Sequence, residues 1–205
     1  MLIFLKPIVI AIVITILAIY ILRPFALQIG LVDSPGSRKH HEGTVPLIGG
    51  IAIFLGVFFG VLLSSIDLNN FNFFLISTLI ILLVGIIDDH SNMSVNSRLT
   101  FQLVIALIAV TLGGVTIESL GNLLGQGEII LNHWSILFSV IAIIAAINAV
   151  NMADGIHGLA GGNSLVSFMA ISYLSINSTS QSSLLISLLF CVVLPVFLVY
   201  NLCFG

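Results

Sequence analysis

Charged residues are scarce in this chain of 205 residues: Asp, Glu, Lys and Arg together make up only 6% of it. A soluble globular domain carries about 25% charged residues, so the composition excludes that class and indicates an integral membrane protein. The five Lys and Arg residues are also too few for the basic surface that binds nucleic acid, and we expect no such partner.

Cysteine is nearly absent as well. Cys191 and Cys203 both lie in the last apolar segment, and no pair of loop cysteines suggests a disulfide framework. We therefore expect both to pack as small apolar residues.

Hydrophobic residues, by contrast, make up 59% of the chain. Runs long enough to cross a bilayer occur at residues 3–22, 47–66, 71–87, 99–114, 134–151, 159–176 and 183–202. We therefore predict an all-α fold, in which residues 1–205 form one integral membrane domain, a polytopic bundle of about seven transmembrane helices. The fourth run is the shortest of them.

Two further patterns bear on this bundle. Residues 115–133 alternate between apolar and polar stretches, which predicts a short external hairpin. Gly56 and Gly60 in the second run are four apart, as in pairs of small residues that let another helix approach closely. Glycine is also simply common in membrane helices, and this alternative stays open.

The cations predict the orientation of the helices. One side of the membrane holds four of them, whereas only Lys6 falls on the other; the four are Arg23, Arg38, Lys39 and Arg98. The positive-inside rule then places the N-terminus outside and the four cations in the cytoplasm. Because the chain changes sides with every helix, the polar loops after the first, third and fifth helices share the cytoplasmic side. These are residues 24–46, 88–98 and 152–158.

The third of these loops lies within a polar stretch, NAVNMADGIHGLAGG, that covers residues 148–162. Asn148 and Asn151 are three residues apart and share a helix face, and Asp154 follows where glycine ends the helix. Amide oxygens, a carboxylate and glycine backbone are together what a metal–phosphate site requires. A solvated loop is the alternative, but polar groups beside hydrocarbon are costly unless they bind something or meet water.

The second loop opens with Asp88 and Asp89 at the C-terminal end of a helix. Carboxylates there oppose the helix dipole at about 0.3–1 kcal/mol each and repel one another. A divalent cation, or a cationic partner such as Lys39, would offset both effects. Because adjacent helical residues point about 100° apart, we expect one aspartate to face the reacting centre and the other to support it or orient a basic residue. Arg98 and Gln102 are four residues apart on the next helix and would present a guanidinium and an amide on one face. Taken alone, Arg98 is more simply explained as a positive charge that sets the orientation of the helix in the membrane.

The first loop, residues 31–50, carries the densest positive charge of the chain, in Arg38, Lys39, His40 and His41. A basic loop that touches anionic lipid head groups would explain the charge. It would not explain the paired histidines or the clustered glycines, which favour a role in handling phosphate.

Together the three loops resemble the polyprenyl-phosphate N-acetylhexosamine-1-phosphate transferases. Three motifs match in order over almost the whole chain: Asp33, Pro35, Arg38, Lys39, His41, Gly43, Pro46, Gly49 and Gly50; then Asp88, Asp89, Arg98 and Gln102; then Asn148, Asn151, Asp154, Gly155, Gly158 and Leu159. Within the family, the likeness is greatest to bacterial members that use UDP-N-acetylglucosamine.

The resemblance implies a reaction. N-acetylglucosamine-1-phosphate would pass from UDP-N-acetylglucosamine to undecaprenyl phosphate, with release of UMP, at the cytoplasmic face of the bacterial inner membrane. Mg²⁺ would be the cofactor, with Mn²⁺ as the alternative. This would be the first membrane step of O-antigen or common-antigen polysaccharide synthesis. Another UDP-sugar is the second reading, and the oligomeric state stays open.

The resemblance also implies roles for individual residues. Asp88 would activate the lipid phosphate with support from Asp89, Asn151 would bind the metal, and Asp154 would lie near the metal and nucleotide. The remaining residues would contact the substrate or hold its loops: Lys39, His41, Arg98, Asn148, His157 and Gly158. His157 stands where relatives usually carry aspartate, near the nucleotide base.

Family members continue beyond this length, with a further aspartate and a histidine-rich loop. The resemblance therefore predicts that this chain is an N-terminal portion with little activity of its own. Two other classes compete with the enzyme. A transporter or channel would carry its charges near the bilayer midplane rather than at helix ends, and a truncated, non-catalytic membrane protein would show no turnover.

Overall fold

The structure is a computed structural model that describes residues 2–33, 45–66, 71–91, 93–154, 158–178 and 180–204. These residues form helices α1 (Leu2–Ile29), α2 (Gly49–Leu62), α3 (Phe71–Ser91), α4 (Val95–Thr111), α5 (Ser135–Ala153), α6 (Leu159–Ile176) and α7 (Gln181–Phe204). A short 3₁₀ turn, η1 (Asn132–Trp134), precedes α5, and two-residue strands β1 (Val32–Asp33) and β2 (Val45–Pro46) pair antiparallel. The predicted all-α fold is confirmed.

Five of these helices are long and apolar enough to cross a membrane: α1, α3, α5, α6 and α7. The other two, α2 and α4, are apolar but shorter, so the prediction of a full span at residues 47–66 was too long. The reason lies in the backbone before α2. Val45 and Pro46 pair with β1, and the Leu47 amide donates to the Leu31 carbonyl, so α2 begins only at Gly49.

The first helix is longer than the sequence indicated. The predicted apolar run ends at residue 22, just before Arg23 and Pro24. Instead α1 continues through Pro24 to Ile29, and Gly30, in the left-handed conformation, follows its end. Arg23 is therefore part of a helix, where its guanidinium lies 5.9 Å from the centroid of the Tyr200 ring.

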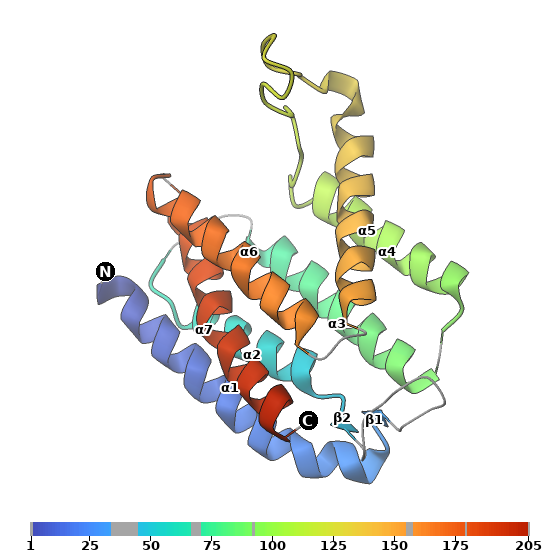
Figure 1. The fold of residues 1–205 in the computed structure, drawn as a ribbon, viewed down its shortest axis with the longest axis vertical. Helices are drawn as coiled ribbons and strands as arrows, with labels where there is room; N and C mark the ends of the chain where they lie inside the picture. Colours follow the sequence, from blue (N-terminus) through green and yellow to red (C-terminus); the bar gives the residue numbers. More distant parts are fainter. Residues whose placement is uncertain are drawn as a thin grey trace. The chain divides into compact units, whose positions relative to one another are not determined.

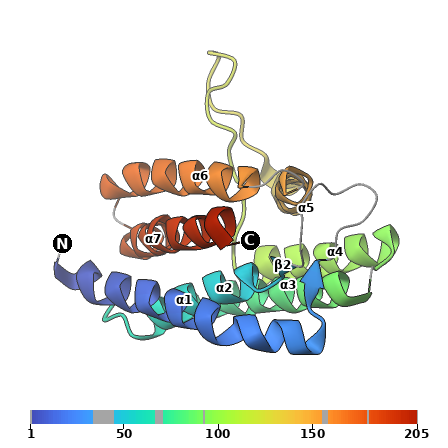
Figure 2. The same cartoon turned by 60° about the horizontal axis from the view of Figure 1, so that its bottom comes forward.

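The chain divides into two compact units, Met1–Leu68 with Ala153–Gly205, and Asn69–Met152. In the first unit α7 packs against α1, α2 and α6, and Figure 2 shows it between α6 and the α1–α2 pair. A methyl group added at Gly56 would overlap the side chain of Thr15, and one at Gly60 would press on Leu189 at 3.0 Å. The prediction that these glycines permit close helix approach is confirmed.

The second unit contains α3, α4 and α5 (Figure 1). Ala106 and Val110 of α4 are buried against Val140 of α5. The predicted hairpin is present before α5: Ser119 bridges Ile130, with backbone hydrogen bonds on either side. Its base is anchored on α5 by the hydroxyls of Ser135 and Ser139, which bond to the backbone of Ile117.

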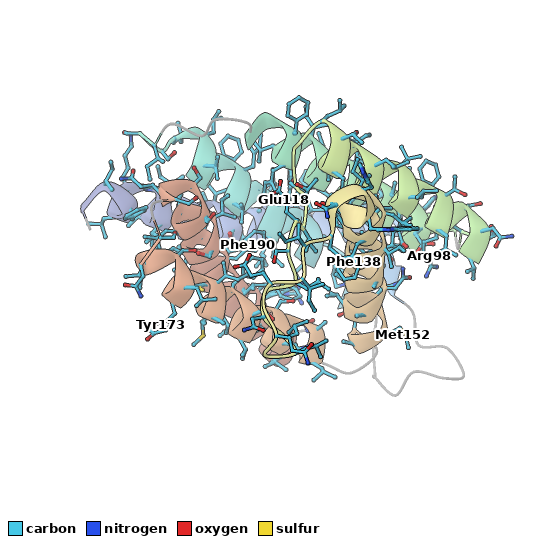
Figure 3. All side chains as sticks on the ribbon, turned by 90° about the horizontal axis from the view of Figure 1, so that it is seen from above. Arg98, Glu118, Phe138, Met152, Tyr173 and Phe190 are labelled. Atoms are coloured by element: carbon cyan, nitrogen blue, oxygen red, sulfur yellow. The ribbon has the colours of Figure 1, made fainter. Side chains whose placement is uncertain are left out.

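Many large apolar side chains are exposed on these helices, and several hydroxyl side chains are buried inside together with apolar ones. Val166 and Leu174 are 65% and 69% exposed, whereas Thr15, Ser139 and Ser187 are buried. Figure 3 shows Tyr173 and Met152, both largely exposed, projecting from the ribbon. The many exposed apolar side chains and the buried hydroxyl groups suit a protein that is surrounded by lipid.

Candidate active site

The predicted aspartate pair occupies the last turn of α3. Asp88 is half-buried and Asp89 is exposed. Beyond α3 the chain turns at once into α4, whose first turn is capped by the Ser94 hydroxyl accepting from the Ser97 amide. The Met93 amide donates to Oδ1 of Asp88 at 3.1 Å. This short connection brings the end of α3 next to the first turns of α4.

Arg98 is the cation that this turn places beside Asp88. Its Nη2 lies 3.0 Å from Oδ1 and 3.0 Å from Oδ2 of the carboxylate. The Arg98 side chain is 33% exposed and that of Asp88 20% exposed, so the pair is partly shielded from water. The sequence predicts that a divalent cation, or a cationic partner such as Lys39, offsets the charge of the aspartates. The cationic side chain beside Asp88 among the described residues is Arg98, and Lys39 lies outside them.

The ion pair uses only one of the three guanidinium nitrogens, Nη2. Asp88 contacts only Nη2, whereas the buried Nε of Arg98 has no hydrogen-bond partner within the described part of the chain. A guanidinium offers five N–H donors in a planar fork that matches carboxylate and phosphate. Arg98 can therefore hold Asp88 and donate to a phosphate oxygen at the same time.

A second polar contact joins α4 to α5. Nδ2 of Asn148 donates to Oε1 of Gln102 at 2.7 Å and to the Ile144 carbonyl at 2.9 Å. Gln102 is only 5% exposed. The sequence indicated that Gln102 accompanies Arg98 on one face, but gave no sign that its partner is Asn148.

The structure therefore brings together four residues of the predicted motifs within the second unit. Arg98 reaches from α4 to Asp88 on α3, and Gln102, one turn further along α4, reaches to Asn148 on α5. Figure 3 labels Arg98 on α4, together with Met152 at the end of α5. Asn151, on the last turn of α5, is exposed.

Asp154 and Gly158 belong to the other unit. Asp154 is exposed just after α5, and Gly158 caps the N-terminus of α6 with a φ of +74°, which favours glycine. The glycines of residues 148–162 were predicted to let backbone approach an anion, but a methyl group at Gly161 would lie 2.7 Å from Leu198 of α7. Gly161 therefore serves helix packing. Lys39, His41 and His157 lie outside the described residues.

The described residues are suitable for Mg²⁺ by their chemistry. They contain no cluster of three His, Cys, Asp or Glu side chains that could hold a metal ion. Mg²⁺ does not require one, because it is commonly bound by one or two protein oxygens together with substrate phosphates. Oδ1 of Asn148 accepts no hydrogen bond from any described residue, because both hydrogen bonds of this side chain are made by Nδ2. Amide oxygens of this kind suit Mg²⁺, and the predicted ligand Asn151 carries another one on an exposed side chain.

Comparison with known proteins decides the family. The model of "Glycosyl transferase family 4" matches residues 71–204, which is more than half of the chain and includes both polar contacts. The chain belongs to this family. The resemblance predicted from the three motifs is thereby confirmed.

Several curated relatives carry one name, undecaprenyl-phosphate α-N-acetylglucosaminyl 1-phosphate transferase. The protein of Yersinia pestis is 34% identical over 164 residues, which are 80% of this chain and 45% of that protein. The protein of Haemophilus influenzae is 39% identical over 158 residues, 77% of this chain and 44% of that protein. The chain thus spans less than half the length of these glycosyl transferase family 4 relatives.

Proposed function

We propose that this chain forms part of a membrane transferase that moves N-acetylglucosamine-1-phosphate from UDP-N-acetylglucosamine to undecaprenyl phosphate and releases UMP. The observation that carries the proposal is the Asp88–Arg98 ion pair at the junction of α3 and α4. It lies in the region matched by the family, and relatives are named for transfer of this sugar phosphate to this lipid.

The reaction exchanges one phosphorus–oxygen bond for another. An oxygen of the lipid phosphate bonds to the phosphorus that carries the sugar, and the bond from that phosphorus to the bridging oxygen breaks. The bridging oxygen leaves with UMP. Catalysis of such a step rests on positioning and on neutralising charge rather than on covalent chemistry by the protein.

Within this scheme, Asp88 accepts the proton of the lipid phosphate, and Asp89 supports it. Arg98 holds the Asp88 carboxylate through Nη2 and donates from another nitrogen of the guanidinium to a phosphate oxygen. Mg²⁺, held by Asn151 and by phosphate oxygens, would neutralise charge on the diphosphate, and Mn²⁺ is the alternative ion.

The resemblance gives roles to further residues. Asp154 would contribute a carboxylate, and Gly158 backbone N–H groups at the start of α6. Lys39, His41 and His157 keep the predicted roles in binding phosphate and nucleotide.

The proposal includes a location. We infer that the protein lies in the bacterial inner membrane with its N-terminus outside and the ends of α3 and α5 at the cytoplasmic face. Single cysteines at positions 41, 90 and 157, in a protein whose Cys191 and Cys203 are changed to serine, test this inference. All three should react with a reagent confined to the cytoplasmic side. Reaction of the three positions from opposite sides would exclude a shared site.

The reaction itself is tested by release of UMP. Membranes that contain the gene product carrying residues 1–205 are supplied with undecaprenyl phosphate, Mg²⁺ and a radiolabelled UDP-sugar. We expect UMP and a labelled lipid with UDP-N-acetylglucosamine. Turnover restricted to another UDP-sugar would support the alternative donor, and no turnover with any UDP-sugar would overturn the proposal.

A transporter is the main competing class. Its charged groups would lie near the middle of the spanning helices. Asp88 lies in the last turn of α3 and Arg98 in the first turn of α4, so both stand at helix ends. This placement favours chemistry at the membrane surface over a pathway through it.

A further inference from the structure

Gln102 is buried on α4 and makes one polar contact among the described residues, the hydrogen bond to Asn148. A buried amide that serves only packing is uncommon, since leaving a polar group in such a place costs stability unless it is satisfied. The contact therefore has a consequence for Asn148, which belongs to the predicted site.

The orientation of the Asn148 amide is determined by its two neighbours. The Ile144 carbonyl can only accept, so the atom of Asn148 that lies 2.9 Å from it must be the nitrogen. That nitrogen also lies 2.7 Å from Gln102, whose facing atom must then be the acceptor Oε1. Both N–H donors of Asn148 are thus used within the protein.

What remains of Asn148 is its oxygen. Oδ1 accepts no hydrogen bond from any residue that the structure describes, and the side chain is half-buried rather than enclosed. With both donors held, the amide presents an acceptor only. Such a group binds a cation or an N–H or O–H donor, and it repels a bare phosphate oxygen.

We propose that Gln102 is a positioning residue, which fixes the Asn148 side chain so that Oδ1 is the atom presented to the substrate. This inference rests on the proposed function, because it concerns the same site. Without Gln102, the amide keeps its bond to Ile144 but loses the second restraint, and the oxygen no longer holds one direction.

The geometry also gives α4 a role as a link. Arg98 and Gln102 are one turn apart on this helix, and they reach to α3 and to α5 respectively. One helix, α4, therefore contributes a restraint both to the carboxylate of Asp88 and to the amide of Asn148. The Met93 amide and the Ile144 carbonyl supply the other restraints.

The test compares three substitutions. Gln102→Met keeps the size of the side chain but removes the acceptor, Gln102→Glu keeps an acceptor, and Gln126→Met makes the first change at an exposed position of the hairpin. Turnover is expressed per folded protein, measured by size-exclusion chromatography. Gln102→Ala, which cannot overpack the site, replaces Gln102→Met if that variant does not fold.

We expect Gln102→Met to lower kcat about tenfold, the effect of one lost hydrogen bond. Gln102→Glu should retain more activity than Gln102→Met, and Gln126→Met should match the wild type. In an Asn148→Ala background, Gln102→Met should have no further effect. An equal loss in that background, or a Gln102→Glu variant no better than Gln102→Met, would overturn the inference.

Thermal unfolding of the wild type, Gln102→Met, Asn148→Ala and the double variant separates this inference from the proposed function. The Gln102→Met and Asn148→Ala changes should be coupled, with a combined fall in Tm smaller than the sum of the single effects. Coupling without turnover of any UDP-sugar would leave the contact intact and remove only the proposed function. Turnover without coupling would remove the role of Gln102 and leave the function.

Discussion

Nη2 of Arg98 lies 3.0 Å from both carboxylate oxygens of Asp88, and the amide of Met93 donates to the same carboxylate at 3.1 Å. Three contacts from two positions on the chain thus converge on a single acidic side chain. The arrangement holds Asp88 in one orientation at the end of α3, where a carboxylate would otherwise oppose the helix dipole.

The first prediction concerns Asp88 itself. The change Asp88→Asn should lower turnover at least about 100-fold, the usual contribution of a positioned acid or base. The asparagine oxygen can still accept from Arg98, so the protein should insert in the membrane and remain folded. Release of UMP and size-exclusion chromatography measure the two properties. Glu128→Gln, at an exposed position of the hairpin, is the matched control, and wild-type activity in Asp88→Asn would remove Asp88 from the mechanism.

The second prediction concerns Arg98→Lys. An ammonium has a single nitrogen, so it cannot hold the Asp88 carboxylate and a phosphate in the fixed geometry of a guanidinium. Loss of one charge-assisted hydrogen bond is worth about 1.5–3 kcal/mol, so the KM for undecaprenyl phosphate should rise at least about tenfold. Arg23→Lys, which makes the same exchange on α1, should leave KM unchanged. An unaltered KM in Arg98→Lys would mean that Arg98 serves only to hold Asp88 or to set topology.

These predictions show which parts of the site could be read from the sequence. The doubled aspartate at a helix end and the spacing of Arg98 and Gln102 indicated a polar centre. The sequence did not show that Arg98 is the partner of Asp88, because this pairing depends on how tightly the chain turns between α3 and α4. Ser94 caps α4 immediately after that turn, so Arg98 reaches Asp88 ten residues away.

The fold divides in the same way. Apolar runs predicted the seven α-helices that the described residues contain, because the length of an apolar run can be read directly from the sequence. Helix ends were less accurate. Proline signals a break, yet α1 passes through Pro24, and the two-residue strand pair that delays α2 has no hydrophobic period.

The third prediction uses two helical glycines in different surroundings. A methyl group at Gly56 would overlap Thr15, whose hydroxyl is bonded to the Ala11 carbonyl, whereas Gly85 on α3 has no atom within 4 Å of the same position. Gly56→Ala should therefore destabilise the protein by about 1–3 kcal/mol. Gly85→Ala should be neutral or slightly stabilising, since alanine is the better helix former. Thermal unfolding in detergent measures both, and an equal Tm for the two variants would contradict the close approach of α1 and α2.

The last prediction concerns the base of the hairpin. The Ser139 hydroxyl accepts from the Ile117 amide at 2.8 Å, and the Ser135 hydroxyl donates to the Ile117 carbonyl at 2.8 Å. One residue of the hairpin is thus held through both of its backbone polar groups, by two serines one turn apart on α5. Both serines are buried, so their hydroxyls have little access to water as an alternative partner.

Removing one of these hydroxyls should free the strand without unfolding the helix, because α5 keeps its own backbone bonds. In Ser139→Ala, hydrogen exchange of the Ile117 amide should therefore quicken by about tenfold, the effect of one lost hydrogen bond. Exchange in the middle of α5 should stay as in the wild type. Ser167→Ala is the control, because the Ser167 hydroxyl bonds only to the Asn163 carbonyl of its own helix. Unchanged exchange at Ile117 in Ser139→Ala would show that the hairpin is held by its own cross-strand bonds and not by α5.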